Sequence, residues 1–381
     1  MRDAVIVDVV RTARGKKKGS LKNTHPMDLL AHCYKGVLKR NNVDAKHVDD
    51  AIAGCVTQTN EQGLNIGRGA VLAAGLPMEI PGTTINRFCG SGLQAINFAA
   101  QAVMSGAEDV VLAGGVESMT RVMMGSDFGP PPTSLTEKYA LVPQGISAEM
   151  VAEKWGISRE ECDRFGYESQ RKAVAAIEAG KFKNEILAIE VENDDGTKRL
   201  FDSEEHPRPD ASVEKMGTLM PSFKPDGVIT AGNSSGIVDG AAVALVMTSD
   251  KAKSLGLKPR ARVVSMAIVG SEPVIMLTGP MPATELALKK AGLRMDQIDL
   301  YEVNEAFAPV PIAWTRDMKA DPAKLNVNGG AIALGHPLGA TGCILTGTII
   351  GELERRKARY GLVTLCIGYG MGIATIFERL G

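Results

Sequence analysis

The chain has 381 residues, which is long enough for two or three domains and excludes a small disulfide-stapled scaffold. Its formal net charge is -1, so no global positive field draws it onto nucleic acid or an anionic membrane, and a phosphate-bearing ligand must be held by local cations. Aromatic residues make up only 4%, which disfavours stacking platforms for single-stranded nucleic acid. The six cysteines are scattered without a CxxC pair, so we expect no metal site and no disulfide framework, and a reducing, cytoplasmic location.

In chain order, strand-like runs rich in Val, Ile and Ala occupy residues 4–10, 51–56, 110–114, 261–268, 300–304 and 362–367. Helical patterns lie between several of them. Residues 27–41 repeat apolar side chains at helical spacing, and residues 158–161 form a capping box that opens a helix ended near Gly180. This alternation is typical of βαβ units and predicts parallel sheets covered on both faces.

The region 118–238 departs from this pattern, because it contains prolines, charges and short helical segments. We interpret it as an insertion or lid domain. The two flanking regions resemble each other: each begins with a strand, continues with a second strand and a small-residue element, and closes with a strand that ends in glycines. They are therefore predicted to form similar sheets that pack together.

Two long stretches without charged residues, 88–107 and 325–351, raise the question of membrane insertion. The first carries Gln94, Asn97 and Gln101 on its expected helix, and the second is interrupted by Pro337 and several glycines. Lipid is a poor environment for both. We expect buried elements of a soluble core, no membrane span and no signal peptide at the strand-like N-terminus.

Cys89 stands immediately before a helical run and is followed by Gly90 and Gly92. A thiol at a helix N-terminus feels the positive end of the helix dipole, which favours the thiolate, and the glycines let a ligand approach the backbone. We interpret Cys89 as a candidate nucleophile. The alternative is a buried structural cysteine.

His336 lies in a glycine-rich loop and is followed by Pro337, an irregular setting that a histidine of the core does not need. We interpret it as a candidate base, against the alternative of a buried histidine whose hydrogen bonds are satisfied. Cys366 ends an apolar strand before a glycine-rich turn. Asn304 and Glu305 follow another strand, and the alternatives to a functional role are a cap for Asn304 and a solvated or structural ion pair for Glu305. Two cysteines and a histidine on different loops supply a nucleophile, a base and an acid, with glycine N–H groups as oxyanion donors.

Together these blocks resemble the thiolase family. The motifs NRFCGSGLQA from residue 86, VNEAF from residue 303, GGAIALGHPLGATG from residue 329 and the terminal CIGxGMG from residue 366 occur in the family's order and span essentially the whole chain. The resemblance implies an α/β fold: a duplicated βαβαβαββ core that forms a five-layered αβαβα body, with an inserted loop domain. The implied boundaries are 1–117 plus 239–259 for the N-terminal core domain, 118–238 for the loop domain and 260–381 for the C-terminal core domain.

The same resemblance implies an acyltransferase of fatty acid β-oxidation and lipid metabolism. It would cleave a 3-ketoacyl-CoA with coenzyme A to acetyl-CoA and a shortened acyl-CoA in a ping-pong reaction. Cys89 would carry the acyl group, and His336 would activate it and, with a water held by Asn304, bind the thioester oxygen. Cys366 would move the proton at the α-carbon of acetyl-CoA. The backbone N–H groups of Cys89 and Gly368 would stabilise the tetrahedral intermediate.

Coenzyme A enters as a co-substrate, and no permanently bound cofactor or metal is expected. Residues 231–236 resemble the family's pantetheine loop, with Ser235 as its contacting serine. Arg208 and Lys215 would lie near the nucleotide. The alternative for Lys215 is a solvated surface side chain that contacts no ligand. Near the pantetheine tunnel fall Phe223, Ala306 and Phe307. The family also implies a homodimer or homotetramer.

Three positions depart from the family's pattern. Tyr369 stands in place of the middle glycine of the usual CIGGG, Val238 stands where asparagine is more common, and Pro143-Gln144-Gly145 replaces a more common methionine-containing segment. We hypothesise that these changes reshape the acyl pocket for a substrate other than simple acetoacetyl-CoA.

Three alternatives remain for the function. The biosynthetic direction, condensation of two acetyl-CoA, uses the same residues. A decarboxylating ketoacyl synthase is disfavoured because that class pairs its cysteine with two histidines, or a histidine and an asparagine, and lacks the second cysteine. A non-catalytic lipid carrier with this fold is disfavoured by the retention of Cys89, Asn304, His336 and Cys366.

Overall fold

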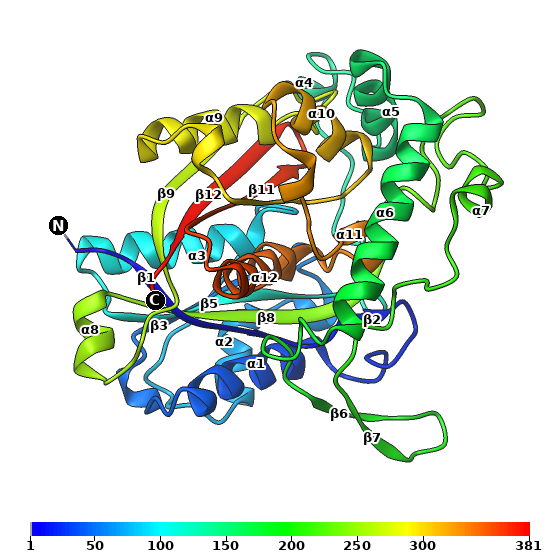
Figure 1. The fold of residues 1–381 in the computed structure, drawn as a ribbon. Helices are drawn as coiled ribbons and strands as arrows, with labels where there is room; N and C mark the ends of the chain where they lie inside the picture. The colour runs from blue at the N-terminus through cyan, green and yellow to red at the C-terminus, as the bar shows by residue number, and fades with distance from the viewer. Residues whose placement is uncertain (1) are drawn as a thin grey trace.

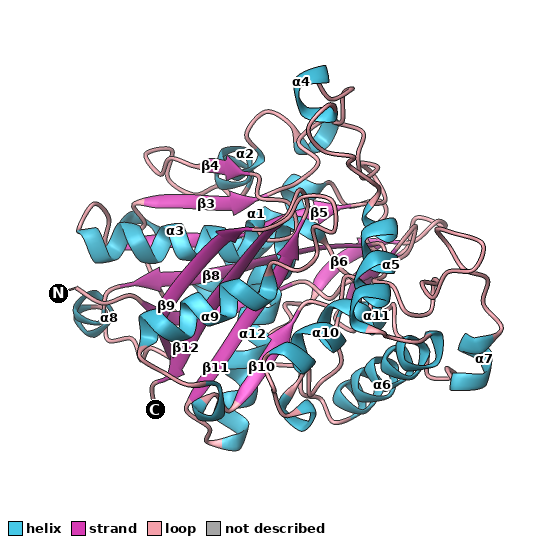
Figure 2. Ribbon diagram, turned by 90° about the horizontal axis from the view of Figure 1, so that it is seen from above, coloured by secondary structure: helices cyan, strands magenta, loops and turns pink. Residues whose placement is uncertain are grey.

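A computed structural model describes residues 2–381 and shows an α/β body of five layers (Figure 1). Helices α1 and α2 cover the outer face of one sheet, helices α3 and α12 lie in the centre, and helices α9 and α10 cover the outer face of the other sheet. The implied αβαβα body is confirmed. Seen from above, the strands β9 to β12 cross over β5 and β8 at an angle (Figure 2).

The N-terminal half follows the order βαβαβαββ, with the short strand β2 added. Its elements are β1 (Val5–Arg11), β2 (Gly15–Lys16), α1 (Pro26–Arg40), β3 (Asp50–Gly54), α2 (Ile66–Ala73), β4 (Thr83–Ile85), α3 (Ser91–Ser105), β5 (Val110–Ser118), β8 (Val238–Met247) and α8 (Ser249–Ser254).

The C-terminal half repeats this order, except that its third strand is reduced to one parallel bridge between Tyr301 and Leu325. Its elements are β9 (Ala261–Gly270), α9 (Pro280–Ala291), β10 (Leu300–Val303), α10 (Pro309–Asp317), α11 (Ala331–Leu334), α12 (Leu338–Arg356), β11 (Tyr360–Ile367) and β12 (Met371–Arg379).

Between β5 and β8 the chain forms a separate set of helices and a small hairpin at one side of the layers (Figure 1). These elements are α4 (Thr133–Thr136), α5 (Gln144–Trp155), α6 (Arg159–Glu178), β6 (Ile189–Glu192), β7 (Lys198–Phe201) and α7 (Val213–Gly217). The capping box predicted at Ser158 is present, and Gly180 adopts a φ of 66° just beyond the end of α6. Short 3-10 turns elsewhere cover Ala45–His47, Asn60–Gln62, Met295–Gln297 and Pro322–Lys324.

The expectation of purely parallel sheets is wrong. The main sheet has the order β10-β11-β12-β9-β1-β8-β5-β3-β4. Only β3 with β4, β3 with β5 and β10 with β11 pair in parallel. The strands β8 and β12, which the sequence reading missed, run antiparallel to both of their main neighbours, because each returns in the opposite direction at the end of its repeat. A two-residue pairing of β1 with β9 joins the two halves into one sheet.

The central layer depends on contacts that only glycine permits. A Cβ on Gly92 of α3 would lie 2.7 Å from the carbonyl oxygen of Gly339, and a Cβ on Gly342 of α12 would lie 2.2 Å from the backbone nitrogen of Leu93. Such distances are too short for any side chain. These glycines therefore bring the first turns of α3 and α12 together.

Helices long and apolar enough to cross a membrane are absent from residues 2–381.

Candidate active site

Cys89 lies in the turn between β4 and α3, and local hydrogen bonds hold this turn. The hydroxyl of Ser91 donates to the carbonyl of Phe88 at 2.6 Å and accepts from the backbone nitrogen of Arg87 at 2.8 Å. Phe88 adopts a φ of 44°, which turns the chain sharply before the cysteine. The Cys89 side chain is buried in a small apolar cluster with Val56, Met119 and Leu338.

The environment of Cys89 corrects the prediction of a favoured thiolate. Burial raises the pKa of Cys89 to about 12, and hydrogen bonds from its own backbone N–H, the Gln144 side chain and the Gly368 N–H only partly oppose this. The nearby carboxylate of Glu117 adds to the rise. Desolvation therefore outweighs the hydrogen bonds, and the nucleophile rests as a neutral thiol that needs a base.

His336 is placed by the loop between α11 and α12. Its backbone nitrogen donates to the carbonyl of Gly236 at 3.0 Å, and the preceding Gly335 has a φ of 91° and packs against Val238. Val238, one of the positions that depart from the family's pattern, is thus a buried support of the histidine loop at the start of β8. Burial lowers the pKa of His336 to about 3, so the imidazole is neutral at physiological pH.

The hydrogen bonds of His336 assign its tautomer. Nδ1 lies 2.6 Å from the hydroxyl oxygen of Thr341, and that hydroxyl donates to the carbonyl of Pro337 at 2.9 Å. The Thr341 oxygen therefore accepts a hydrogen bond from the Nδ1–H group of His336, so the lone pair of the imidazole is on Nε2. The side-chain amide of Asn304 faces Nε2 at 3.3 Å as a donor. The imidazole is consequently oriented as a base.

Cys366 is the penultimate residue of β11 and pairs with Gly372 of β12. Its thiol is buried, and both burial and the proximity of Cys89 raise its pKa. Asn304 follows the neighbouring strand β10, where its backbone nitrogen donates to the carbonyl of Thr364 at 3.0 Å. Adjacent parallel strands thus bring Asn304 and Cys366 to the same edge of the sheet.

Glu305 is buried rather than solvated or paired with a cation at hydrogen-bond distance. Its carboxylate accepts from Ser169 at 2.6 Å, from Asn326 at 2.8 Å and from the backbone nitrogen of Ile332 at 3.1 Å. It thereby ties α6 and α11 to the loop that carries Asn304. We assign it a structural position beside the site.

Gly368 and Tyr369 follow Ile367, the last residue of β11. The N–H of Gly368 is directed toward the Cys89 sulfur. Tyr369 has a φ of 60° and is 52% exposed, and its ring stands edge-on to the ring of Phe88 with centroids 5.4 Å apart. The bulky residue therefore turns outward and packs against Phe88, the residue that precedes Cys89.

The residues predicted to contact pantetheine also lie close to one another. The backbone nitrogen of Ser235 donates to the carbonyl of Ala306 at 3.0 Å. The rings of Phe223 and Phe307 stand edge-to-face at 5.9 Å. Because Gly236 also contacts His336, the 231–236 loop connects this group of residues to the catalytic loop.

Arg208 and Lys215 lie apart from these residues, in a pocket of about 170 Å³ next to Ala231 and Gly236. The ammonium of Lys215 pairs with Asp210 at 2.8 Å, and the backbone of Arg208 is held by Gln170 at 2.9 Å. His206 lines the same pocket. A much larger cavity of about 1030 Å³ lies along α6 and reaches none of the predicted catalytic residues.

Two further residues at the site had no assigned role in the sequence reading. Glu117, at the end of β5, is buried and accepts hydrogen bonds from the backbone of Val56, Thr57 and Gly339 and from Gln62. A single acidic residue at the end of the apolar run 110–118 was the only sequence signal. Thr341 was hidden inside the GATG motif, where nothing distinguished it from a helix residue.

Comparison with known proteins agrees with this geometry. Residues 4–250 match the thiolase N-terminal domain model and residues 257–379 match the thiolase C-terminal domain model. The steroid 3-ketoacyl-CoA thiolase FadA6 of Mycobacterium tuberculosis is 48% identical over all of this chain and 95% of its own length. A 3-ketoacyl-CoA thiolase of Klebsiella pneumoniae is 47% identical over the full length of both. The crystal structure of the Bacillus anthracis acetyl-CoA acetyltransferase superposes with a TM-score of 0.93 at 38% identity, covering 100% of this chain and 99% of that one.

The fold and the site thus define an enzyme that transfers acyl groups between thiols. The chain belongs to the thiolase family, and it is a thiolytic acyl-CoA C-acyltransferase.

Proposed function

We propose that the chain cleaves a 3-ketoacyl-CoA with coenzyme A, giving acetyl-CoA and a shortened acyl-CoA, through an acyl group on Cys89. The observation that carries this proposal is the meeting of two buried thiols, Cys89 and Cys366, at a site whose imidazole is neutral, with its proton on Nδ1 and its lone pair on Nε2. Two thiols allow one to hold the acyl group while the other moves a proton.

In the first step the Cys89 sulfur attacks the 3-keto carbon and its proton passes to Nε2 of His336. Because the pKa values of the two groups are about 12 and about 3, the proton leaves the sulfur only as the bond to carbon forms. The oxyanion accepts hydrogen bonds from the N–H groups of Cys89 and Gly368, both of which face the sulfur.

In the second step the bond between the second and third carbons of the substrate breaks. The electron pair goes to the departing acetyl-CoA enolate, and Cys366 delivers its proton to that carbon. The protonated His336 and Asn304 bind the enolate oxygen. Coenzyme A then gives its thiol proton to the Cys366 thiolate and attacks the acyl group, and His336 returns a proton to the released Cys89.

The contacts of coenzyme A belong to the same proposal. Ser235, Ala306, Phe223 and Phe307 would line the path of the pantetheine arm, which their mutual contacts support. Arg208 and Lys215 would approach the nucleotide phosphates from the adjoining pocket.

The cellular assignments are also proposed rather than observed. We place the enzyme in the cytoplasm, in fatty acid β-oxidation, as a homodimer or homotetramer with three domains divided at residues 117/118, 238/239 and 259/260. The 47–48% identity to 3-ketoacyl-CoA thiolases, against 38% to an acetyl-CoA acetyltransferase, favours the degradative direction. Exposed apolar side chains, among them Leu64, Met78, Met123 and Phe128, support self-association.

The variant Cys366→Ala tests the division of labour between the two thiols. We expect exchange of acyl groups between a simple acyl-CoA and Cys89 to survive in part, while cleavage of 3-ketoacyl-CoA falls by roughly three orders of magnitude. Cys33→Ala, in the outer layer on α1, is the matched control and should leave both rates near the wild-type values. Equal loss of both activities in Cys366→Ala would contradict its role in carbon–carbon bond chemistry.

A further inference from the structure

Gln144 is the first residue of α5 and follows Pro143 at the edge of the Cys89 pocket. Its side-chain amide is close enough to the Cys89 sulfur to lower the pKa of that thiol, against the larger rise caused by burial. The Nε2 atom of Gln144 lies beside Gly368, because a Cβ added to Gly368 would be only 3.3 Å from this atom. The amide is therefore adjacent both to the sulfur that carries the acyl group in the proposed mechanism and to one of the two oxyanion donors.

Apart from the catalytic groups and Glu117, the side chains that pack against Cys89 are apolar. Cys89 packs with Val56, Met119 and Leu338, and the ring of Phe88 lies against the same cluster. A primary amide has two N–H donors and one acceptor oxygen, and sulfur is a weak acceptor for them. When an acyl group enters and water leaves, an amide donor without an oxygen partner is costly.

The charge near the sulfur limits which kind of oxygen on the acyl group can accept a hydrogen bond from the Gln144 amide. Glu117 lies close enough to raise the pKa of Cys89, so the local field is negative and disfavours a carboxylate on the acyl group. A hydroxyl or keto oxygen carries no such penalty. An oxygen on the third carbon of the acyl group is four bonds from the sulfur, which is close enough for it to fold back toward a group that touches the sulfur.

We propose that Gln144 determines the acyl specificity of this enzyme by donating a hydrogen bond to a neutral hydroxyl or keto oxygen on the third carbon of the acyl group held by Cys89. The inference rests on the proposed function, because it needs an acyl group on Cys89. It names the substrate class as 3-ketoacyl-CoAs whose shortened acyl product bears such an oxygen, in preference to plain alkyl chains.

Acyl exchange tests this preference with two stable probes of equal length, 3-hydroxybutyryl-CoA and butyryl-CoA. In this exchange a sulfur–carbon bond forms at Cys89, the bond to coenzyme A breaks, and the Cys89 proton moves to the released coenzyme A. The rate is measured by incorporation of labelled coenzyme A. We expect wild type to exchange the hydroxy probe roughly tenfold faster, the factor that corresponds to one net hydrogen bond.

The variant Gln144→Met keeps the length of the side chain and removes the amide. We expect it to bring the ratio of the two rates close to one, chiefly by slowing the hydroxy probe. Tyr369→Phe, which removes a hydroxyl from the ring that stands edge-on to Phe88 and leaves the Gln144 amide in place, is the control and should keep the wild-type ratio.

Three outcomes would overturn the inference: a wild-type ratio near one, an unchanged ratio in Gln144→Met, or an equal loss on both probes. Equal loss would mean that the amide serves the thioester oxygen that the probes share. Intact mass separates this failure from a failure of the proposed function. If wild type gains no acyl mass on Cys89 with either probe, the function fails; if both probes acylate Cys89 equally fast, only the role of Gln144 fails.

Discussion

The two central helices occupy equivalent places in the two halves of the core, yet their N-termini are built differently. Cys89 precedes α3, whose first turn has no side-chain cap. His336 precedes α12, whose first turn is capped from another strand, because the carboxylate of Glu117 accepts from Gly339 at 2.9 Å. The two repeats therefore place the nucleophile at the N-terminus of one central helix and its base at the N-terminus of the other.

The difference has an electrostatic meaning. A carboxylate at a helix N-terminus balances the positive end of the helix dipole. At α12 Glu117 provides this balance next to a neutral imidazole, whereas the N-cap of α3 makes no side-chain hydrogen bond. The glycine contacts between Gly92, Gly339 and Gly342 hold the two N-termini together, so the two chemistries meet at one point.

Replacing the cap of α12 is the strongest way to break this asymmetry. In Glu117→Ala the buried N–H groups of Val56, Thr57 and Gly339 lose their acceptor, so we expect the free energy of unfolding to fall by at least about 3 kcal/mol. Chemical denaturation measures this change. Glu117→Gln keeps one acceptor oxygen and should recover part of the loss; a neutral effect of both variants would refute the capping role.

The contact between the helices can be disturbed directly. In Gly342→Ala the new Cβ would stand 2.2 Å from the backbone nitrogen of Leu93, so we expect a loss of about 1–3 kcal/mol in unfolding free energy. Gly351→Ala lies on the same helix with only ordinary contacts and should be neutral or stabilising by up to about 1 kcal/mol. Thermal unfolding of the two variants side by side distinguishes close packing from helix propensity, and similar melting temperatures would count against the former.

The variant Thr341→Val tests how the catalytic base, His336, is held at the N-terminus of α12. The variant keeps the shape of Thr341 but removes the oxygen that accepts from Nδ1 of His336, so the tautomer is no longer enforced. We expect kcat/KM for thiolysis to fall roughly tenfold with little change in folding. Thr341→Ser retains the hydroxyl and should restore activity, and a Val variant as active as wild type would show that the tautomer needs no such partner.

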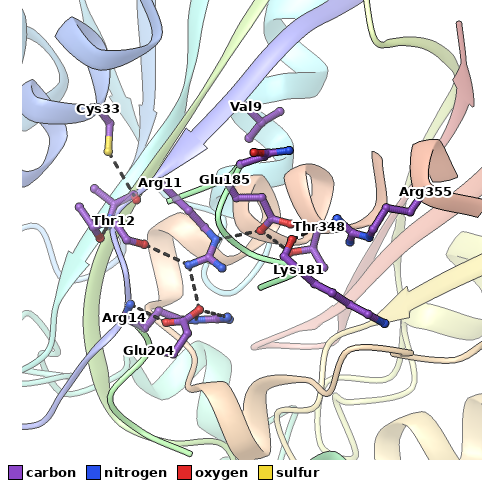
Figure 3. Close-up of polar contacts among 12 residues, drawn as sticks. Val9, Arg11, Thr12, Arg14, Cys33, Lys181, Glu185, Glu204, Thr348 and Arg355 are labelled. Atoms are coloured by element: carbon purple, nitrogen blue, oxygen red, sulfur yellow. Dashed lines mark hydrogen bonds and ion pairs between the residues drawn. The ribbon is translucent and has the colours of Figure 1, made fainter. Parts of the chain in front are cut away.

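The last comparison concerns a different part of the molecule, the ion-pair network of Figure 3. Arg11 there bridges Glu185 and Glu204, and Arg14 also pairs with Glu204. Burial alone would raise the pKa of Glu204, but the two guanidinium groups outweigh it and hold the pKa at about 2.

A carboxylate with a depressed pKa stabilises the fold above its unfolded pKa, near 4.5, and loses that contribution as the pH falls toward about 2. The stability advantage of wild type over Glu204→Gln should therefore be constant from pH 8 to 6 and shrink below about 4.5. Denaturant titrations at several pH values measure it. An advantage that grows in acid would contradict the assigned charge state.

The strands and the candidate catalytic residues left local signals in the sequence, whereas the five layers followed from the resemblance to the thiolase family. Periodic apolar runs marked six strands within a few residues of their observed bounds, and Cys89, His336 and Cys366 stood in glycine-rich settings that a core residue does not need. The strand β12 was missed because it follows β11 without a helix between, and β8 was missed because it follows the insertion 118–238, where the regular alternation of strands and helices is interrupted.

The rest of the site depends on contacts between distant segments. The expected thiolate at Cys89 was wrong because burial, which no local pattern reports, outweighs the helix N-terminus. The caps supplied by Glu117 and Thr341 were invisible for the same reason. Gly92, whose small size was interpreted as giving a ligand access to the backbone, instead permits the close contact of α3 with α12.

The most direct test of the acyl-Cys89 mechanism is the intact mass of the protein after incubation with a 3-ketoacyl-CoA in the absence of free coenzyme A. Wild type should gain the mass of the shortened acyl group, and Cys89→Ala should gain none. No gain on wild type, or an undiminished gain on Cys89→Ala, would contradict the covalent role of Cys89.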